Sequence, residues 1–443
     1  MAVSPGSICL VLTPSGDPGE AADLERVFGR GIAPGLAAAG LKALREDAAS
    51  LRTPLGRPLF ERVVLSDRVV ADLTHASADL VYALGVRHGL RPDATVCLLA
   101  EGHPAPLNPA LAPALRYAHD DAGLAQLGPA LADRLGALAG SPGPQASDAG
   151  LVGSLVGGGG PAIARLKTDE FRDRVDYAPD LRRRLAAARS QSDSAALHRI
   201  EASLGALEDV EAGALIDLML SYRATSDWDA VVALCDAMPP VLQRTVLVRE
   251  QRAFALNRRG ERAAAAELLG AVLAEHGPSS ETCGLLGRVH KDRWREALTS
   301  DPAAAAAHLE RAIAAYLRGF EADWRDAYPG INALTLLDIQ GAPASLTRRD
   351  ALLPVVRYAV DRRLDGQDPD YWDHATLLEL AVLARDEAAA RRHLRAALAV
   401  AREPWEPEST ADNLRLVRTA RAERDAAEPW LDDVIAELAA RRS

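Results

Sequence analysis

The chain has 443 residues, a length that suits about three ordinary domains or one domain followed by a long repeat array. Hydrophobic residues make up 48% and charged residues 26%, which predicts a soluble, well-packed protein. The net charge of −11 excludes non-specific nucleic-acid binding as the main function. No apolar run approaches the ~20 residues of a membrane span, so no membrane partner is expected.

The first apolar run, Ile8 to Leu12, is too short for a signal peptide and lacks a basic flank, so a cytoplasmic location is expected. Four cysteines are scattered in apolar runs without metal-ligand spacing: Cys9, Cys97, Cys235 and Cys283. This pattern predicts buried thiols in a reducing compartment and no metal site.

Strands and helices are predicted to alternate through residues 1–140. A continuous apolar run at residues 8–12 indicates a buried parallel strand, and further strands are predicted at residues 41–44, 69–73 and 95–99. Helical spacing is found at residues 21–39, 58–65, 79–89 and 124–138. The alternation predicts a Rossmann-like α/β domain with a doubly wound parallel sheet.

In such a sheet, ligands bind beyond the carboxyl ends of the strands. The candidate site residues at these positions are Thr13, Ser15, Gly16, Arg45, Asp72 and Thr74. Thr13 and Ser15 either contact a phosphate or ribose or only form a turn. Arg45 either binds a phosphate or carboxylate or is solvated. Asp72 is either a ligand-binding group or a capping carboxylate.

The segment SDRVVADLTHASADLVYALGVRHGL, residues 66–90, is similar to the nucleoside 2-deoxyribosyltransferase and TIR-like superfamily, whose enzymes act on N-glycosidic bonds. The sequence Asp72-Leu73-Thr74 matches the end of that family's strand, and Tyr82, Leu84 and Gly85 match the helix that follows. The resemblance implies that the domain binds a nucleotide- or NAD-type ligand. It adds Asp79, Tyr82 and Gly85 to the candidate ligand-binding residues.

The catalytic glutamate of this superfamily falls on Ala83, and its Asn-Pro-Asn motif reads Ser77-Ala78-Asp79. Alanine can act neither as a nucleophile nor as a stabiliser of a sugar cation, so the domain is expected to be inactive as a glycosidase. Three explanations remain open. The domain is a natural pseudoenzyme, Ala83 is an engineered substitution, or Asp79, one helical turn earlier, supplies a displaced carboxylate.

Two segments follow the last predicted strand. Residues 107–117, LNPALAPALRY, resemble the proline-containing segment that comes after the last strand in bacterial relatives of that superfamily. Residues 141–161 are rich in Gly, Pro and Ser and are predicted to form a linker. The run Gly157–Gly160 lacks a preceding strand and a following Lys-Ser/Thr, which excludes a phosphate loop.

Residues 162–443 are predicted to form a tetratricopeptide-like helical array. Small residues stand where two helices approach closely at residues 253–278 and again at residues 380–404. Pro-Trp pairs at residues 404–405 and 429–430 are predicted packing anchors near the C-terminal end. Arrays of this kind bind a partner protein on one face.

Within the array, LLGRVHKD (residues 285–292), RGFE (318–321) and YPGINA (328–333) resemble the TRAFs-binding domain of the apoptosis signal-regulating MAP kinase kinase kinases. Residues 368–386 resemble the following part of the same region. No kinase motif follows, so the resemblance implies a stand-alone regulator built on this scaffold rather than a kinase.

Helical spacing predicts an inward face of Leu285, Leu286, Val289 and Trp294. It predicts an outward basic stripe, which is either solvated or contacts an acidic partner, formed by Arg288, Lys291, Arg293 and Arg295. Asp301 is predicted to cap a helix that starts at Pro302, and Pro329-Gly330 to break the chain. Predicted core tryptophans are Trp228, Trp294, Trp324 and Trp372.

These features together predict a bacterial signalling or defence regulator. An α/β domain (residues 1–140) would bind a nucleotide- or NAD-type ligand, and a helical domain (162–443) would relay occupancy to a protein partner. The alternative is an N-glycosidic-bond hydrolase or transferase for NAD or nucleosides whose glutamate is replaced by Ala83. A third interpretation is a pure scaffold with an empty α/β domain. Homo-oligomerisation is left open.

Overall fold

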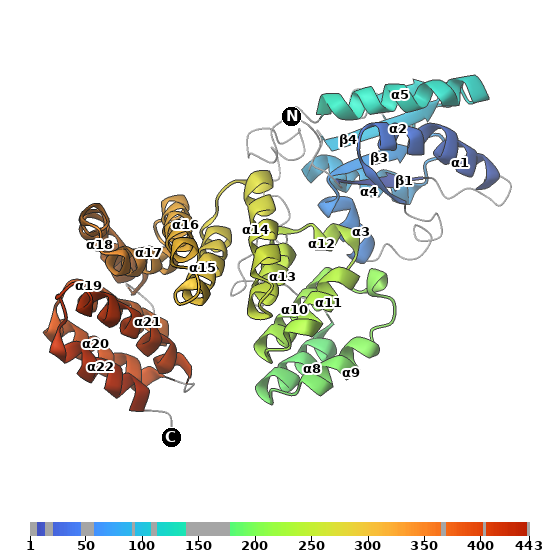
Figure 1. Ribbon diagram of the computed structural model, residues 1–443. Coiled ribbons are helices and arrows are strands. Elements are labelled where there is room, and N and C mark those ends of the chain that lie inside the picture. Colours follow the sequence, from blue (N-terminus) through green and yellow to red (C-terminus); the bar gives the residue numbers. More distant parts are fainter. Residues whose placement is uncertain are drawn as a thin grey trace. The chain divides into compact units, whose positions relative to one another are not determined.

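The computed structural model of the protein describes residues 7–13, 21–45, 57–90, 94–107, 113–138, 178–364, 369–401 and 405–440. Internal contacts divide the chain into two compact units, Met1–Arg249 and Glu250–Ser443. The first contains a parallel sheet and the first helices of the array, and the second contains the later helices (Figure 1). The predicted fold class, an α/β domain and an all-α helical array, is confirmed.

The sheet has five parallel strands in the order β2-β1-β3-β4-β5. The chain order changes direction between β1 and β3, so the switch point of this doubly wound sheet lies there. In register, Val11 pairs with Arg45 and Val70, and Leu98 pairs with Asp72. The strands are β1 (Ile8–Leu12), β2 (Lys42–Arg45), β3 (Arg68–Asp72), β4 (Thr95–Ala100) and β5 (Ala114–Tyr117).

Successive side chains of each strand enter two different cores, because side chains alternate across a sheet. Cys9 and Val11 pack with a π-helical segment, η1 (Phe28–Ile32), and with α2 (Ala33–Ala38) and α5 (Asp121–Leu138). Leu10 and Leu12 pack with α3 (Arg57–Leu65) and α4 (Ala78–Leu90). Helix α1 (Ala21–Val27) joins the first core through Val27. Helices therefore cover both faces, with α5 and α2 on one side of the strands in Figure 1.

Strand β5 was not predicted from the sequence. Residues 107–117 were expected to follow the last strand, whereas Ala114–Tyr117 pairs with β4 at the sheet edge. Only Tyr117 of these four residues is buried. An edge strand with an exposed arginine lacks the continuous apolar run that marks a central strand, so its sequence does not reveal it.

Helix α3 is bonded to the first helices of the array. The Glu61 carboxylate accepts a hydrogen bond from the backbone N–H of Ala212 at 2.8 Å, which satisfies a free donor at the start of α10 (Ala212–Ala224). Arg62 donates to the Glu208 carbonyl at 2.8 Å. The other helices here are α8 (Pro179–Ser190), α9 (Ser194–Ala202), α11 (Trp228–Ala237), α12 (Pro240–Gln243) and the start of α13 (Val246–Arg258). The predicted linker, residues 141–161, lies outside the described residues.

The second unit is a series of helix pairs. From α14 to α20 each helix packs against the next, α21 packs against α22, and contacts also join α15 to α17, α17 to α19 and α19 to α21. This pairing is that of a tetratricopeptide-like array. The helices are α14 (Arg262–His276), α15 (Ser280–Ala297), α16 (Pro302–Ala322), α17 (Ala327–Gln340), α18 (Pro343–Leu364), α19 (Tyr371–Leu383), α20 (Glu387–Val400), α21 (Trp405–Ala422) and α22 (Pro429–Ala439).

The helix limits around α16 and α17 test two sequence predictions. Asp301 caps α16 as predicted, because its carboxylate accepts from the Ala304 N–H at 2.9 Å. The predicted break at Pro329-Gly330 is wrong, since both residues lie in the first turns of α17. Proline fits there because the first N–H groups of a helix have no intrahelical acceptor.

Burial corrects the predicted helix faces. Val289 and Trp294 are buried as predicted, but Lys291, expected outside, is only 3% exposed. Helix α15 contacts both α16 and α17, so more than one of its faces is covered. Trp324 and Trp372, expected in the core, are 50% and 41% exposed.

Other sequence expectations concern anchors and surfaces. Trp430 packs against the core of the last helices, whereas the Trp405 side chain lies outside the described residues. The four cysteines are buried, and burial raises the pKa of Cys9 to about 12 and that of Cys97 to about 11. Among the residues that can be placed, no helix is both long and apolar enough to cross a bilayer.

Candidate functional site

The candidate site lies at the carboxyl ends of β3, β4 and β5. The Asp72 carboxylate is buried and accepts hydrogen bonds from the Thr74 N–H at 3.0 Å, the Thr74 hydroxyl at 2.6 Å and the Tyr117 hydroxyl at 3.1 Å. The Thr74 hydroxyl also accepts from the Ala100 N–H at 3.1 Å. We call Asp72, Thr74 and Tyr117 the edge cluster. Their hydrogen bonds connect the ends of three strands.

The pKa of Tyr117 fixes the direction of its hydrogen bond within the edge cluster. Burial, together with the nearby negative charge of Asp72, raises the pKa of Tyr117 above its ordinary value. The Tyr117 hydroxyl therefore stays protonated and donates to Asp72 at neutral pH. A fixed carboxylate between two hydroxyl groups can orient polar atoms of a ligand, but its own oxygens are already engaged.

Three histidines follow these same strand ends. The rings of His75 and His103 are 5.0 Å apart between centroids, and those of His103 and His119 are 6.3 Å apart. The His119 ring also lies 5.9 Å from that of Tyr117. Its Nε2 atom is 2.9 Å from the carboxylate of Asp23 on α1. Imidazoles in this position can donate to or accept from a phosphate or a sugar hydroxyl.

The sequence prediction missed the histidines, although a signal exists. Each histidine comes two or three residues after the last residue of its strand: Asp72, Ala100 or Tyr117. The regularity becomes visible only once β5 is known, because without β5 no strand end precedes His119. No group of three or more His, Cys, Asp or Glu in the described ranges is arranged to hold a metal ion.

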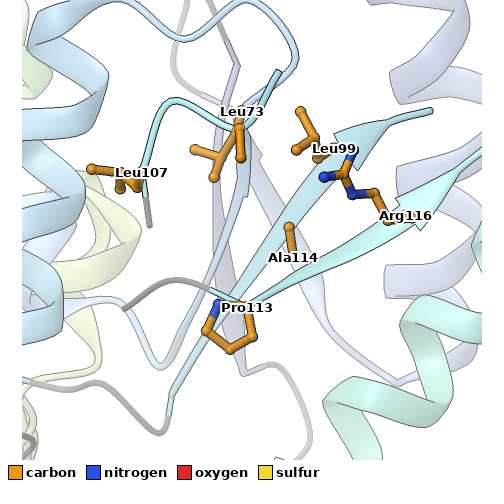
Figure 2. Close-up of a pocket in the computed structure, with 7 residues that line it drawn as sticks. Leu73, Leu99, Leu107, Pro113, Ala114 and Arg116 are labelled. Atoms are coloured by element: carbon orange, nitrogen blue, oxygen red, sulfur yellow. The ribbon is translucent and has the colours of Figure 1, made fainter. Parts of the chain in front are cut away.

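A pocket of about 210 Å³ opens beside this edge, on the α4 side of the sheet (Figure 2). Leucines line one part of it, and the Arg116 side chain of β5 lies at its rim (Figure 2). The volume is smaller than the ~300 Å³ at which most small-molecule sites begin. The lining residues are Leu73, Leu99, Ala105, Leu107, Pro113, Ala114 and Arg116.

The structure brings only part of the predicted site together. Thr13 is buried directly after β1, and Asp72 and Thr74 are bonded to each other. Arg45 is instead paired with Glu25 at 2.6 Å, and its guanidinium lies 4.6 Å from the centre of the Phe28 ring. Ser15 and Gly16 lie outside the described residues.

The predicted residues of α4 lie on different sides of the helix. Tyr82 is 62% exposed, and Asp79 and Gly85 are also exposed. Ala83 is fully buried in the core with Leu10 and Leu84. The bonding partners of the Asp72 carboxylate are Thr74 and Tyr117 rather than Tyr82. Position 83 therefore faces the apolar interior.

These features define a class of protein: an α/β domain joined to a helical protein-interaction array. Residues 163–436 match the MAP3K TRAFs-binding domain family. The match spans more than half of the chain, and the chain belongs to this family. It begins after the sheet, so the α/β domain is not part of it.

Curated relatives agree with this assignment. The chain is 29% identical over 223 residues to mitogen-activated protein kinase kinase kinase nsy-1 of Caenorhabditis elegans, covering 46% of this chain and 15% of the relative. It is 27% identical over 248 residues to mitogen-activated protein kinase kinase kinase 15 of Mus musculus, covering 53% and 18%. The chain thus spans less than a fifth of the length of these relatives.

A solved structure was also matched. A thermophilic TPR protein of Thermus thermophilus is 16% identical, with a TM-score of 0.36, and the match covers 45% of this chain and 97% of that chain.

Proposed function

We propose that this protein is a bacterial signalling or defence regulator whose helical array binds a partner protein and whose α/β domain binds a nucleotide- or NAD-type ligand. The observation that supports it most is family membership across residues 163–436, since the family is described by its binding of TRAF proteins. A TRAF-like adaptor, or a protein that takes its place, is the partner this membership favours.

Exposed aromatic side chains support a protein-binding role for the second unit. The rings of Trp324 and Tyr358 stack with centroids 6.4 Å apart, and the two residues are 50% and 55% exposed. Aromatic side chains that are left exposed are enriched at protein interfaces because they bury much area with little loss of entropy.

The geometry of the sheet edge supports the ligand half of the proposal. The pocket of about 210 Å³ has apolar walls and one guanidinium, which suits a single base better than a complete dinucleotide. The histidines lie beyond the same strand ends and would face the sugar or phosphate, whereas Tyr117 of the edge cluster belongs to the core on the other face of the sheet and fixes the strand ends. Ligands of open α/β sheets bind at this edge.

A physical connection exists within the first unit between the sheet and the array. Val63 of α3 shares a core with Leu73 and Leu99, which also line the pocket. The two residues before Val63 in the same helix, Glu61 and Arg62, bond to the start of α10 and to the turn before it. Occupancy of the pocket can therefore displace α3 and the helices bonded to it.

Site-specific photocrosslinking tests the partner half. A photoreactive amino acid replaces Arg295 on α15 in one variant and Arg348 on α18 in another, both exposed in this structure. We expect one defined protein to be crosslinked from the native host through position 295. Absence of a specific crosslink at both positions would contradict a protein-binding array.

Thermal shift and calorimetry test the ligand half with NAD, ATP and adenosine as probes. We expect at least one of them to stabilise the chain, and Asp72→Asn to weaken that effect. If none binds, the α/β domain is an empty scaffold.

The alternative activity, N-glycosidic cleavage with a lost glutamate, is not favoured. A glutamate at position 83 would point into the core that contains Leu10 and Leu84, not toward the strand ends.

A further inference from the structure

A buried lysine connects alternate helices of the second unit. Lys291 on α15 is 3% exposed, and its ammonium donates to the Oδ1 atoms of Asn413 on α21 at 2.9 Å and Asn332 on α17 at 3.3 Å. The carboxylate of Glu379 on α19 accepts from Asn413 and from the hydroxyl of Thr335, each at 3.3 Å. We call these five residues the lysine cluster.

Among the residues that the structure describes, none is a direct counter-ion of Lys291. In the described part of the chain its ammonium forms no ion pair, and the Glu379 carboxylate is connected to it only through Asn413. A buried ammonium is costly unless it is paired and hydrogen-bonded. Burial lowers the pKa of Lys291 to about 8, and burial raises the pKa of Glu379. An additional carboxylate beside the ammonium would offset this cost.

Hydrogen-bond donors remain in the cluster after its internal bonds are counted. An ammonium has three N–H groups, and Lys291 uses two of them. The Asn332 amide uses one N–H on the Tyr328 carbonyl, and the Asn413 amide uses one on Glu379. The Lys291 ammonium and the side-chain amides of Asn332 and Asn413 thus each keep one N–H that has no acceptor among the residues described. A carboxylate, with two acceptor oxygens, matches such donors.

Three members of the cluster are only partly buried, and the surroundings of the cluster carry positive charge. Asn332, Glu379 and Asn413 are half-buried. Arg295, one turn along α15 from Lys291, is exposed and forms no ion pair with any residue that the structure describes. The other charged groups that act on the ammonium are Arg288 and Asp292, which pair with each other at 3.1 Å. The two arginines and Lys291 outnumber the two carboxylates, Asp292 and Glu379, so the net charge around the cluster is positive. A positive surface favours an acidic partner.

We propose that the lysine cluster is a receptor for a carboxylate of an acidic segment in the partner protein. The inference rests on the proposed protein-binding function of the array and specifies where, and by which chemistry, the partner is held. The carboxylate is a side chain of Asp or Glu or the C-terminal carboxylate of the partner. Both present the same pair of oxygens to Lys291, Asn332 and Asn413.

Three pools of short randomised peptides test this proposal with the full chain. One pool is free of acidic residues and has a free C-terminus, the second is amidated with one fixed glutamate, and the third is amidated without any carboxylate. The chain is immobilised and the bound peptides are quantified. We expect about tenfold or greater enrichment of the first or second pool over the third, because charged hydrogen bonds contribute strongly. The pool enriched identifies the source of the carboxylate.

Variants connect the binding to the cluster. Lys291→Met is expected to lose the enrichment, while the matched control Arg348→Met on α18 keeps it. Arg295→Gln, exposed and therefore compatible with folding, is expected to weaken binding severalfold through the lost positive charge. Equal enrichment of all pools by the native chain, or unchanged binding by both Lys291→Met and Arg295→Gln, would overturn the proposal.

The outcome separates this inference from the proposed function. A partner crosslinked through position 295 that still binds Lys291→Met leaves the array as a protein-binding module and removes the lysine cluster as its receptor. If peptides bind through a carboxylate but no protein is crosslinked, the lysine cluster is a carboxylate receptor and the proposed binding of a partner protein by the array is wrong.

Discussion

The side chain at position 83 decides the enzymatic alternative. Ala83 is fully buried among leucines, so Ala83→Glu would introduce both excess volume and a buried carboxylate. We expect the substitution to lower the free energy of unfolding by about 3 kcal/mol or more, measured by urea denaturation. We expect no release of base from NAD or nucleosides.

The matched control for this change is Tyr82→Glu, since Tyr82 is the neighbouring position on α4 and is 62% exposed. A change at an exposed helix position is expected to alter stability by less than ~1 kcal/mol. A stable Ala83→Glu protein that cleaves an N-glycosidic bond would show that position 83 reaches the ligand.

Lys291 gives the folded protein a defined pH dependence. Its pKa falls from 10.5 to about 8, first because of burial and then because of Arg288, while Glu379 and Asp292 act in the opposite direction. The unfolded chain therefore binds more protons than the folded chain between these values, and stability from this group rises as pH increases through that window. Below about pH 8, burial of the charged ammonium lowers the free energy of unfolding by roughly 3 kcal/mol.

Urea denaturation of wild type and Lys291→Met at several pH values measures this effect. We expect the stability of wild type relative to Lys291→Met to increase between about pH 8 and pH 10.5 and to be constant between pH 6 and pH 7. A difference that does not change with pH would mean that Lys291 keeps its ordinary pKa. Arg295 is charged in both proteins over this range. Lys291 lowers the pKa of Glu379, so its removal raises that pKa, and the comparison therefore rests on the change in stability above about pH 8.

At the scale of elements, glycine sets how closely α15 and α16 approach. A Cβ atom at Gly287 would lie 2.8 Å from ring atoms of Tyr316, which is fully buried and cannot move aside. We expect Gly287→Ala to destabilise the protein by about 1–3 kcal/mol through overpacking.

The control for this prediction is Gly270→Ala in α14. An added Cβ there meets no atom within 4 Å, and the position is exposed. Alanine is the better helix former, so a gain of about 0.5–1 kcal/mol is expected. If both changes stabilise the protein to the same extent in thermal denaturation, the close approach of the two helices is not needed.

At the scale of the whole second unit, buried charges join helices that are far apart in sequence. Asp338 on α17 is fully buried and accepts from Arg421 on α21 at 2.9 Å and also from Arg349 on α18. The Arg421 guanidinium further donates to the Val382 carbonyl of α19 at 3.2 Å and to the Glu428 carboxylate. This network connects four helices, as the lysine cluster does.

Asp338→Ala would leave the buried guanidinium of Arg421 without its main counter-ion. We expect a loss of about 3–5 kcal/mol, with reduced hydrogen-exchange protection within Glu250–Ser443. Asp361→Ala, which breaks the exposed pair with Arg357, is expected to cost less than ~1 kcal/mol. Similar losses for both variants would show that the network contributes no more than a surface pair.

Much of the fold could be predicted because its signals are local. The strand Ile8–Leu12 is a continuous apolar run, the strand Arg68–Asp72 has an apolar centre, and the cap at Asp301 followed by Pro302 is a pattern within one turn. The candidate site was predicted only in part. Asp72 and Thr74 are adjacent to a strand end, whereas His119 depends on an edge strand that carries no clear apolar signal.

The sequence by itself determined the element types, the α/β-then-helical order and the family of the helical part, because periodicity, capping and motif spacing act over a few residues. Tertiary structure alone decided which charged side chains are inside: Lys291 and Arg421 look like surface residues on an isolated helix. They become buried because helices up to 122 residues away supply their hydrogen-bond partners. Such partners are set by packing in space, which no window along the chain contains.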